Sequence, residues 1–315
     1  MASVLYIFNP EHDLCLANGD RHYMPPSSAV QFAFAGVEAM RILYGDDACV
    51  VAAAGYGEWK NAHPDFTPSR IVPWGWNLRL KQQLVELGVA SELLPDDDRL
   101  ERMRKLQHRA TLLPLQPHAS QCCDEASVSA FVEAHGEVVM KSPWSGAGRG
   151  LRWVSRQLGE KDRFWLHRVL RQQGSVVVEQ RFRRLYDFAI EYVVEQGHVR
   201  KTGYSLFETQ SGVYRCNHLL ADADIRRQVG IGDALEERLL TWLDATVAPY
   251  YEGPLGVDLF TTEDGSCKVC EMNLRHTMGM VAHSYLERRP WAVGERWIFS
   301  PTDLYRTLSN IRERQ

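Results

Sequence analysis

A chain of 315 residues can hold one large domain or about two to three smaller ones, each with a substantial core. It is 45% apolar and 24% charged, which is ordinary for a globular protein, and its net charge of −4 gives no general case for binding nucleic acid or an anionic membrane. We find no apolar run near the ~20 residues of a membrane helix and no basic segment typical of a signal peptide. The seven scattered cysteines fit a reducing compartment, so we expect a cytoplasmic protein.

The first hundred residues alternate between predicted strands and predicted helices. The strands are expected at 4–8, 48–54 and 90–94, and the helices at 28–42 and 78–87. This order predicts a small parallel α/β domain over residues 1–99.

Polar residues follow the first predicted strand directly. Ligands of parallel α/β domains bind beyond the carboxyl ends of the strands, so Asn9, His12 and Asp13 are predicted at the mouth of a site. His12 beside Asp13 could bind a metal or move protons. The favoured alternative is that these residues cap the loop or contact a substrate by hydrogen bonds.

A glycine-rich segment, SPWSGAGRG at 142–150, lies between predicted strands at 137–141 and 151–154. Alternating glycines let the backbone turn sharply and aim N–H groups at an anion. The segment is neither a Walker A loop nor a dinucleotide fingerprint, because no Gly-Lys-Ser/Thr follows and the next element is a strand. What remains is a hairpin loop that covers phosphates, with Lys141 on the strand before it; a merely flexible loop is the alternative.

A second apolar strand is predicted at 175–179, followed by Gln-Arg-Phe and, at Asp187, by a further strand over 187–194. The strand edge could hold an adenine through its backbone and the carboxylate could hold a ribose, although strand-terminal acids are common without such a role. Between these motifs, basic residues alternate with Trp153 and Trp165. This pattern can bind single-stranded nucleic acid, but a helix at 160–172 with a solvated basic face is favoured, so nucleic acid is not expected as a partner. Further on, 203–217 is interpreted as a loop whose Tyr204, Phe207 and Tyr214 either line a pocket or pack.

The segment GPLGVDLFTTEDGSCKVCEMNLRH, 253–276, predicts two strands joined by a tight turn at Asp264 and Gly265. In that register Asp258 lies opposite Glu271, with Cβ atoms roughly 4.5–5.5 Å apart, and Asn273 shares their face. Adjacent carboxylates repel each other without a cation, so the three oxygens suit Mg²⁺. A solvated acidic hairpin face is the alternative. Because an i, i+3 pair on a strand faces opposite sides, the CxxC at 267–270 is rejected as a metal or redox site.

Together these motifs resemble the ATP-grasp superfamily. The resemblance rests on the order KSPWSGAGRG, VVVEQRF with the later Asp187, GPLGVDLF and EMNLR, and it covers roughly residues 100–283. It implies an α/β fold with an α+β core, in which residues 1–99 form the domain that precedes an ATP-grasp domain at 100–315. The latter would comprise a glycine-loop subdomain at about 100–180 and a metal-site subdomain at about 181–315.

The resemblance also implies roles for individual residues. Lys141 would hold the ATP phosphates, and Arg275 would stabilise the transferred phosphoryl group or an acyl-phosphate. The other implied nucleotide contacts are Ser145, Gly146, Gly148, Arg149 and Gly150 in the loop, Glu179, Arg181 and Phe182 at the adenine, and Asp187 at the ribose. A further basic residue is usual upstream, where Lys105 and Arg109 are the candidates. Asp258, Glu271 and Asn273 would bind one or two Mg²⁺ ions, or Mn²⁺, and Lys201 and His276 are loosely implied at the substrate.

The implied chemistry is ATP-driven ligation of a carboxylate to an amine or thiol, with release of ADP and phosphate. The substrate would be a small molecule or peptide bearing a carboxylate, and a homodimer would be unsurprising. Two alternatives remain open: a small-molecule kinase of the ATP-grasp type, and a nucleotide-binding regulatory protein without turnover.

Overall fold

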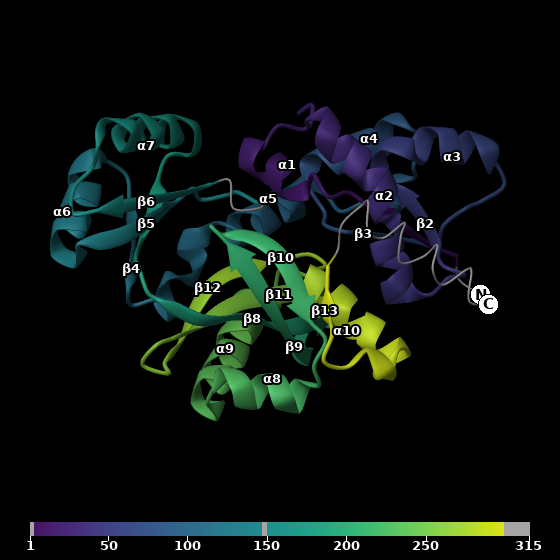
Figure 1. Cartoon of the computed structure of the whole chain (residues 1–315). Helices are drawn as coiled ribbons and strands as arrows, with labels where there is room; N and C mark the ends of the chain where they lie inside the picture. The colour runs from purple at the N-terminus through teal and green to yellow at the C-terminus, as the bar shows by residue number, and fades with distance from the viewer. Residues whose placement is uncertain (1–2, 147–149, 299–315) are drawn as a thin grey trace.

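The computed structural model describes residues 3–146 and 150–298, which form three β-sheets with helices packed on them (Figure 1). The first sheet has the strand order β2-β1-β3 and is parallel. Its elements are β1 (Val4–Phe8), β2 (Cys49–Ala52), β3 (Arg70–Pro73), α1 (His12–Asn18), α2 (Ser27–Tyr44), the 3-10 turn η1 (Ala53–Gly55), α3 (Tyr56–Ala62) and α4 (Leu78–Glu86). We call this part the N-terminal layer. The predicted parallel arrangement of this segment is present.

The third strand of that sheet is not the one that the sequence predicts. Residues 90–94, predicted as a strand, instead contain the 3-10 turn η2 (Ser91–Leu93), while the pairing partner of β1 is β3. The partly buried residues Leu93 and Leu94 pack against an apolar core to which β1, α3 and α4 contribute. The strand β3 escapes prediction because it is only four residues long and ends in a proline.

Helix α2 packs closely on β1 because Gly36 has no side chain. A Cβ atom at Gly36 would lie 2.1 Å from Cε1 of Phe8, whose side chain is fully buried. The same core, which we call the shared core, includes Val281 and Ala282 from the C-terminal part of the chain. The N-terminal layer and helix α10 (Met278–Arg288) are therefore held together by common apolar packing.

We expect Gly36→Ala to lower the free energy of unfolding by about 1–3 kcal/mol, because the new methyl group must displace a buried ring. In an open helix the same change would stabilise by about 1 kcal/mol, so the sign itself is diagnostic. Urea unfolding followed by circular dichroism measures the change, with Gln31→Ala on the exposed side of α2 as the control. A Gly36→Ala protein as stable as the wild type would contradict the close packing of α2 on β1.

The second sheet is antiparallel, with the strand order β4-β7-β5-β6, and forms a separate lobe at one end of the molecule (Figure 1). Its elements are β4 (Ala119–Cys122), α6 (Glu125–His135), β5 (Glu137–Lys141), β6 (Leu151–Ser155), α7 (Glu160–Gln173) and β7 (Val176–Gln180). Both helices pack on one face through a core that includes Val128, Leu166 and Val178. We call this part the four-stranded lobe. It is joined to the N-terminal layer by α5 (Asp97–Leu106) and the 3-10 helix η3 (Arg109–Leu115).

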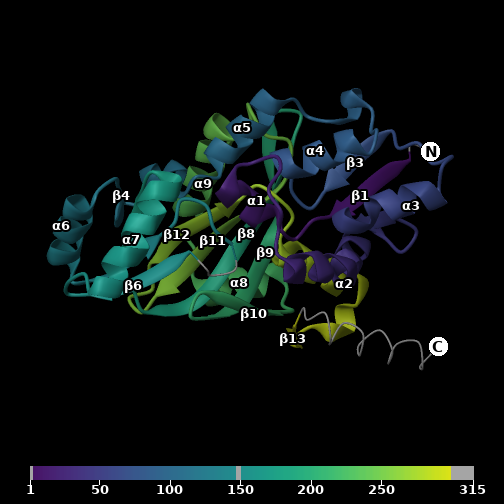
Figure 2. The same cartoon turned by 90° about the horizontal axis from the view of Figure 1, so that it is seen from above.

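The third sheet has the order β12-β11-β8-β9-β10-β13 and lies between the other two parts (Figures 1 and 2). Its elements are β8 (Arg184–Glu195), β9 (His198–Gln210), β10 (Val213–His218), α8 (Asp222–Val229), α9 (Asp233–Thr246), β11 (Gly253–Thr262), β12 (Cys267–Asn273), the 3-10 turn η4 (Pro290–Ala292) and β13 (Arg296–Trp297). Helices α8 and α9 cover one face through residues such as Ile225 and Leu239, which leaves the opposite face for the cleft. Among the described residues, no helix is both long and apolar enough to cross a bilayer.

The interpretation of 203–217 as a loop is wrong. These residues belong to the hairpin of β9 and β10, whose tight turn places Ser211 and Gly212 at φ of 53° and 76°. Positive φ at both central residues is the turn geometry that matches the twist of a two-stranded ribbon. Of the aromatic residues predicted there, Phe207 and Tyr214 line cavities in the cleft and Tyr204 is buried in the core beneath the sheet.

The hairpin of β11 and β12 confirms the predicted pairing of Asp258 with Glu271, although its turn is different. The turn is wider than two residues, because the Thr262 N–H donates to the Ser266 carbonyl at 2.9 Å. The register then shifts by one at a β-bulge formed by Cys270, which restores the predicted pair. Bulges often re-aim side chains beside functional sites, and here Cys270 and Glu271 both line the cleft.

Candidate active site

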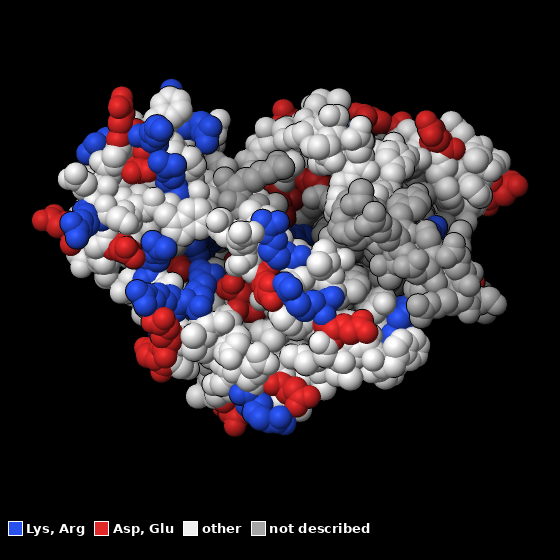
Figure 3. All heavy atoms as spheres, viewed as in Figure 1, with Lys and Arg blue, Asp and Glu red and all other residues white. Residues whose placement is uncertain are grey.

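A cleft lies between the four-stranded lobe and the open face of the six-stranded sheet. Figure 3 shows the molecule hollowed near its middle, with acidic and basic side chains around the hollow. One part of the cleft, which we call the larger cavity, has a volume of about 500 Å³ and is lined by residues that include Lys141, Glu179, Phe182, Asp187 and Cys270. The second part, the smaller cavity, has a volume of about 210 Å³ and includes Asp13, Glu191 and Arg275. Asp258 and Glu271 line both.

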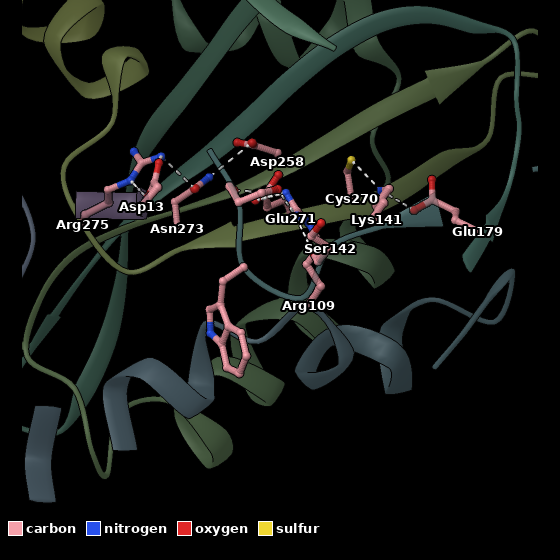
Figure 4. Close-up of polar contacts among 12 residues, drawn as sticks. Asp13, Arg109, Lys141, Ser142, Glu179, Asp258, Cys270, Glu271, Asn273 and Arg275 are labelled. Atoms are coloured by element: carbon pink, nitrogen blue, oxygen red, sulfur yellow. Dashed lines mark hydrogen bonds and ion pairs between the residues drawn. The ribbon is translucent and has the colours of Figure 1, made fainter. Parts of the chain in front are cut away.

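Lys141 and Glu179 form a buried ion pair at the base of the larger cavity (Figure 4). They come from the neighbouring strands β5 and β7, where Val139 is the register partner of Glu179, so both side chains share one face of the sheet. Cys270 Sγ lies 3.6 Å from the Lys141 ammonium. Burial alone would lower the pKa of Lys141, but Cys270 and Glu179 outweigh it and hold that pKa above its usual value. Lys141 is therefore a charged donor that lines the larger cavity, and its role at the phosphates stays a prediction.

Arg184, which was not predicted from the sequence, lines the larger cavity beside the predicted residue Asp187. Its guanidinium stacks at 3.9 Å from the centre of the Phe260 ring and bonds to Asp187 at 3.0 Å. Asp187 also accepts a hydrogen bond from Thr209 at 2.7 Å, and the predicted residues Arg181 and Phe182 lie on the same wall. Sequence reasoning missed Arg184 because no pattern separates it from the neighbouring arginines 181 and 183.

The carboxylates of Asp258 and Glu271 face the same space, and Asn273, two residues beyond Glu271 in β12, joins them on the same face (Figure 4). The Asn273 amide donates to Asp258 at 3.2 Å. Burial, followed by the nearby carboxylates of Glu271 and Glu191, raises the pKa of Asp258 to about 8. Two carboxylates and an amide oxygen fit a hard divalent cation, which would offset both the burial of the Asp258 charge and its repulsion by the nearby carboxylates.

Arg109, rather than Lys105, is the upstream basic residue that enters the cleft. Its buried guanidinium donates to Glu271 at 2.6 Å, to the Ser142 carbonyl at 2.5 Å and to Ser145 Oγ at 2.7 Å. Lys105 is exposed on α5 and lines neither cavity. Arg109 therefore connects the start of the glycine-rich segment to the carboxylate pair.

The described part of the glycine-rich segment lies beside the carboxylate pair, and its predicted role over the phosphates stays a prediction. Ser145 and Gly146 line the smaller cavity, and Gly150 is packed against Ser142 and Ser145 at the other end of the segment. Gly148 and Arg149 were also predicted as contacts and lie outside the described residues. The described ends of the segment are thus anchored at the point where the two cavities meet.

Arg275 and Asp13 face each other across the mouth of the smaller cavity, although they are far apart in the chain (Figure 4). Two nitrogens of Arg275 bond to the two Asp13 oxygens at 3.0 and 2.9 Å, and Arg275 also donates to Asn273 at 3.1 Å. Burial opposes ionisation of Asp13, but Arg275 outweighs it and holds the pKa of that carboxyl below its usual value. The predicted residues Asp13 and Arg275 are therefore parts of one charged pair in the cleft.

The other residues predicted at a substrate lie away from both cavities. Asn9 is buried. Its side-chain amide donates to the Gly75 carbonyl at 2.9 Å and accepts from the Gly75 N–H at 3.2 Å. His12 packs on Gly75, and burial lowers its pKa to about 4, so it is neutral at pH 7. His276 is likewise buried, with its ring 2.6 Å from the Tyr44 hydroxyl, and borders a different cavity. Lys201 bonds to Glu236 at 2.7 Å on the face covered by α9. These four residues support the fold around the cleft.

Acidic residues accompany the basic helix α7. Arg152 bonds to Asp162 at 2.5 Å and Arg163 to Glu125 at 2.8 Å, and Figure 3 shows both signs of charge over this lobe. Trp153, part of the same pattern, borders the larger cavity. These contacts favour the interpretation of a solvated helix face.

Sequence comparison finds neither a matching protein-family model nor a matching curated protein. Comparison of the structure finds D-cycloserine synthetase, with 17% identity, a TM-score of 0.54, and coverage of 90% of this chain and 99% of that chain. D-alanyl-alanine synthetase A from Vibrio cholerae O1 biovar eltor has 12% identity, a TM-score of 0.54, and 98% coverage of each chain. Carboxyaminoimidazole ribonucleotide synthase from Aspergillus clavatus, complexed with ATP, has 14% identity, a TM-score of 0.52, and coverage of 91% and 77%. All three are ATP-grasp enzymes.

The chain has the ATP-grasp fold. The resemblance inferred from the four motifs is thereby confirmed for the fold. Within this ATP-grasp fold, the division into domains at residue 99 and at about residue 180 remains a prediction. The roles of the individual side chains rest on the geometry of the cleft.

Proposed function

We propose that this protein is a Mg²⁺- and ATP-dependent ligase that activates a carboxylate as an acyl-phosphate and joins it to an amine. The observation that carries the proposal is the junction of the two cavities. There, the carboxylates of Asp258 and Glu271 lie between the larger cavity with its buried lysine and the smaller cavity with its arginine. A phosphoryl transfer between a nucleotide and a second substrate needs such a junction.

In this proposal ATP occupies the larger cavity. The backbone near Arg181 and Phe182 receives the adenine, with Glu179 beside it, and Asp187 binds the ribose. Lys141 and the glycine-rich segment hold the phosphates, where the ammonium and the backbone N–H groups offset their charge. Arg109 reaches the same phosphates from behind the segment.

Asp258, Glu271 and Asn273 would hold one or two Mg²⁺ ions, or Mn²⁺. A bound Mg²⁺ would neutralise charge on the phosphate oxygens as the γ-phosphoryl group leaves ADP. Arg109 donates to Oε1 of Glu271, so Oε2 of that carboxylate would be the oxygen that binds an ion while this contact is kept. Asn273 Oδ1 accepts a hydrogen bond from Arg275, so that contact, and the contact of Arg109 if both Glu271 oxygens bind, would have to shift for the three side chains to hold an ion.

The reaction needs little covalent work from the protein. A substrate carboxylate oxygen attacks the γ-phosphorus and ADP leaves; the amine nitrogen then attacks the acyl carbon, loses a proton, and phosphate leaves. Arg275, held by Asp13, would position the carboxylate and offset the charge of the acyl-phosphate. Catalysis then rests on positioning and charge neutralisation.

The test is ADP release from purified protein with Mg²⁺, ATP and a panel of carboxylates, each with and without an amine. Release that requires both substrates supports ligation. Release with a phosphorylated product and no need for an amine indicates a kinase instead. Nucleotide binding without any release across the panel would contradict an enzymatic role and favour the regulatory alternative.

Arg109 and Lys105 provide a matched pair of variants. We expect Arg109→Met to weaken binding of a non-hydrolysable ATP analogue with Mg²⁺ by about tenfold or more, because a charged donor is lost from a buried site. Lys105→Met removes the same charge from an exposed site outside the cavities and should leave affinity within about twofold. Isothermal titration calorimetry measures both. If both variants lose the same affinity, Arg109 contributes only through the net charge of the protein and not through a contact with the nucleotide.

A further inference from the structure

A further acidic residue, Glu191, is buried in the smaller cavity and belongs neither to the carboxylate pair nor to the pair of Asp13 and Arg275. Glu191 is only 2% exposed. Its two oxygens accept hydrogen bonds from Ser205 Oγ and Thr277 Oγ1, each at 2.9 Å. No lysine or arginine within residues 3–146 and 150–298 forms an ion pair with it. Burial raises the pKa of the Glu191 carboxyl to about 7, because it outweighs the two hydrogen bonds and the positive charges of His283 and Arg275.

The position of Glu191 on β8 places it beyond the reacting centre. Asp187, Ala189 and Glu191 alternate along one face of the strand, and in the adjacent strand Asp258 is the register partner of Ala189. Asp187 lies in the larger cavity and Glu191 in the smaller one. Along this face, the order is therefore the ribose-binding position, the carboxylate pair, and then Glu191.

Two glycines leave room around the Glu191 carboxylate. A Cβ atom at Gly279 would lie 2.1 Å from Oε1 of Glu191, and one at Gly256 would lie 2.8 Å from Oε2. Any other residue at these positions would press on the carboxylate. Gly279 itself lines the smaller cavity, so the absence of a side chain there keeps the acid accessible from the cavity.

Two further polar groups in the same cavity have no hydrogen-bond partner among the described residues. They are Oδ1 of Asn217, a residue that is 1% exposed, and the hydroxyl of Tyr214. The Asn217 amide nitrogen already donates to the Met278 carbonyl at 3.0 Å, which fixes Oδ1 as the free acceptor. Buried polar atoms are rarely left without partners, so these two groups are available to a ligand that enters the cavity.

The chemistry of the three groups selects one kind of ligand. A carboxylate, an amide oxygen and a phenol oxygen can all accept hydrogen bonds, and a primary ammonium offers three N–H donors and a positive charge. A carboxylate ligand would instead be repelled by Glu191. We propose that Glu191, Asn217 and Tyr214 form a subsite for the primary ammonium group of a substrate. Its assignment to the amine-bearing substrate of a ligase rests on the proposed function.

The test uses ethylammonium as the probe, titrated into the full-length protein and followed by ligand-observed NMR, with and without Mg²⁺ and a non-hydrolysable ATP analogue. Glu191→Gln keeps the size of the side chain and removes its charge, and we expect binding to weaken by about tenfold or more. Tyr214→Phe should weaken ethylammonium binding about threefold. Because this variant keeps the carboxylate, it still tests the subsite if Glu191→Gln does not fold. Glu195→Gln, on the exposed end of the same strand, is the matched control and should bind as the wild type does.

Tetramethylammonium carries the same charge but has no N–H donor, and it should bind at least tenfold more weakly than ethylammonium to the wild type. Equal binding of the two cations, equal binding by wild type and Glu191→Gln, or no binding to the folded wild type would overturn the subsite. The thermal shift with the ATP analogue is recorded on the same samples. If the ATP analogue gives no thermal shift but ethylammonium still binds more tightly than tetramethylammonium, the proposed function is wrong and the subsite stands. If the analogue gives the shift but the two cations bind equally, only the subsite is wrong.

Discussion

Asp258→Asn is expected to lower ATP turnover by about 100-fold or more and also to raise the melting temperature of the metal-free protein at pH 8. Turnover falls because the variant loses a charged ligand for the ion that offsets phosphate charge. Stability rises because the folded wild type must hold the half-buried Asp258 beside Glu271, where its pKa is about 8. Asn keeps the shape and can keep the contact with Asn273 without that charge.

The pH dependence follows from the direction of the shift. Since an unfolded Asp has a pKa near ~3.9, the raised folded pKa means that the folded state binds the proton more tightly. The contribution of Asp258 to stability is therefore fully present below about pH 4 and is lost as the pH rises through about 8. Thermal melts in EDTA should show wild type and Asp258→Asn converging near pH 4 and separating by at least ~1 kcal/mol at pH 8.

Mg²⁺ with a non-hydrolysable ATP analogue should reverse this order by stabilising only the wild type. Glu263→Gln, exposed at the turn of the same hairpin, is the control and should match the wild type throughout. Full turnover in Asp258→Asn would refute the metal assignment. A variant that melts below the wild type at pH 8 in EDTA would refute the account of the raised pKa.

Lys141→Met is expected to lower the free energy of unfolding by about 3 kcal/mol and to abolish nucleotide binding. Removing one member of a buried ion pair leaves the other charge without compensation, which typically costs about 3–5 kcal/mol. Glu179 is 1% exposed, and Arg184 at 3.8 Å offers it only partial compensation. The double variant Lys141→Met/Glu179→Gln should recover most of the stability and none of the binding. Urea unfolding and calorimetry measure the two effects.

A double-mutant cycle decides whether the pair is coupled as proposed. The exposed pair of Arg163 and Glu125 serves as the comparison, and breaking it should cost less than about 1 kcal/mol. If the effects of Lys141→Met and Glu179→Gln simply add, the buried pair is not a unit. If the double variant binds nucleotide normally, Lys141 has no role at the phosphates.

The parts of the fold that could be predicted from sequence are those governed by local patterns. The hairpin that carries Asp258 and Glu271 follows from period-two alternation, and its pairing was predicted correctly although the turn was not. Two deviations, a wider turn and a bulge at Cys270, cancel along the strand. Local signals define the strands well, but the turn residues Asp264 and Gly265 do not fix the loop length, because the Asp264 carboxylate accepts hydrogen bonds from Thr262 and Ser266 within a wider turn.

The parts that could not be predicted depend on contacts between distant segments. Nothing near Asn9 or His12 in the sequence shows that Gly75 and Asn77 will enclose them. Arg184 likewise gains its place from the Phe260 ring of another strand. Glu191 is different, because the sequence does contain a signal for it. Glu191 lies four residues after Asp187 in an apolar strand, so the period of two predicts that both acids share the face that lines the cleft.

The shared core between the N-terminal layer and α10 has a mechanical consequence. The apolar core of the four-stranded lobe is drawn entirely from residues 122–178, whereas the shared core combines Phe8 and Met40 with Val281 and Ala282. The lobe can consequently swing about its connections as a rigid body without opening either core. The N-terminal layer cannot, because its rotation would pull buried side chains into water. We therefore expect any hinge motion around the proposed nucleotide site to move the lobe that bears Lys141 and to leave Asp13 and Arg275 in place.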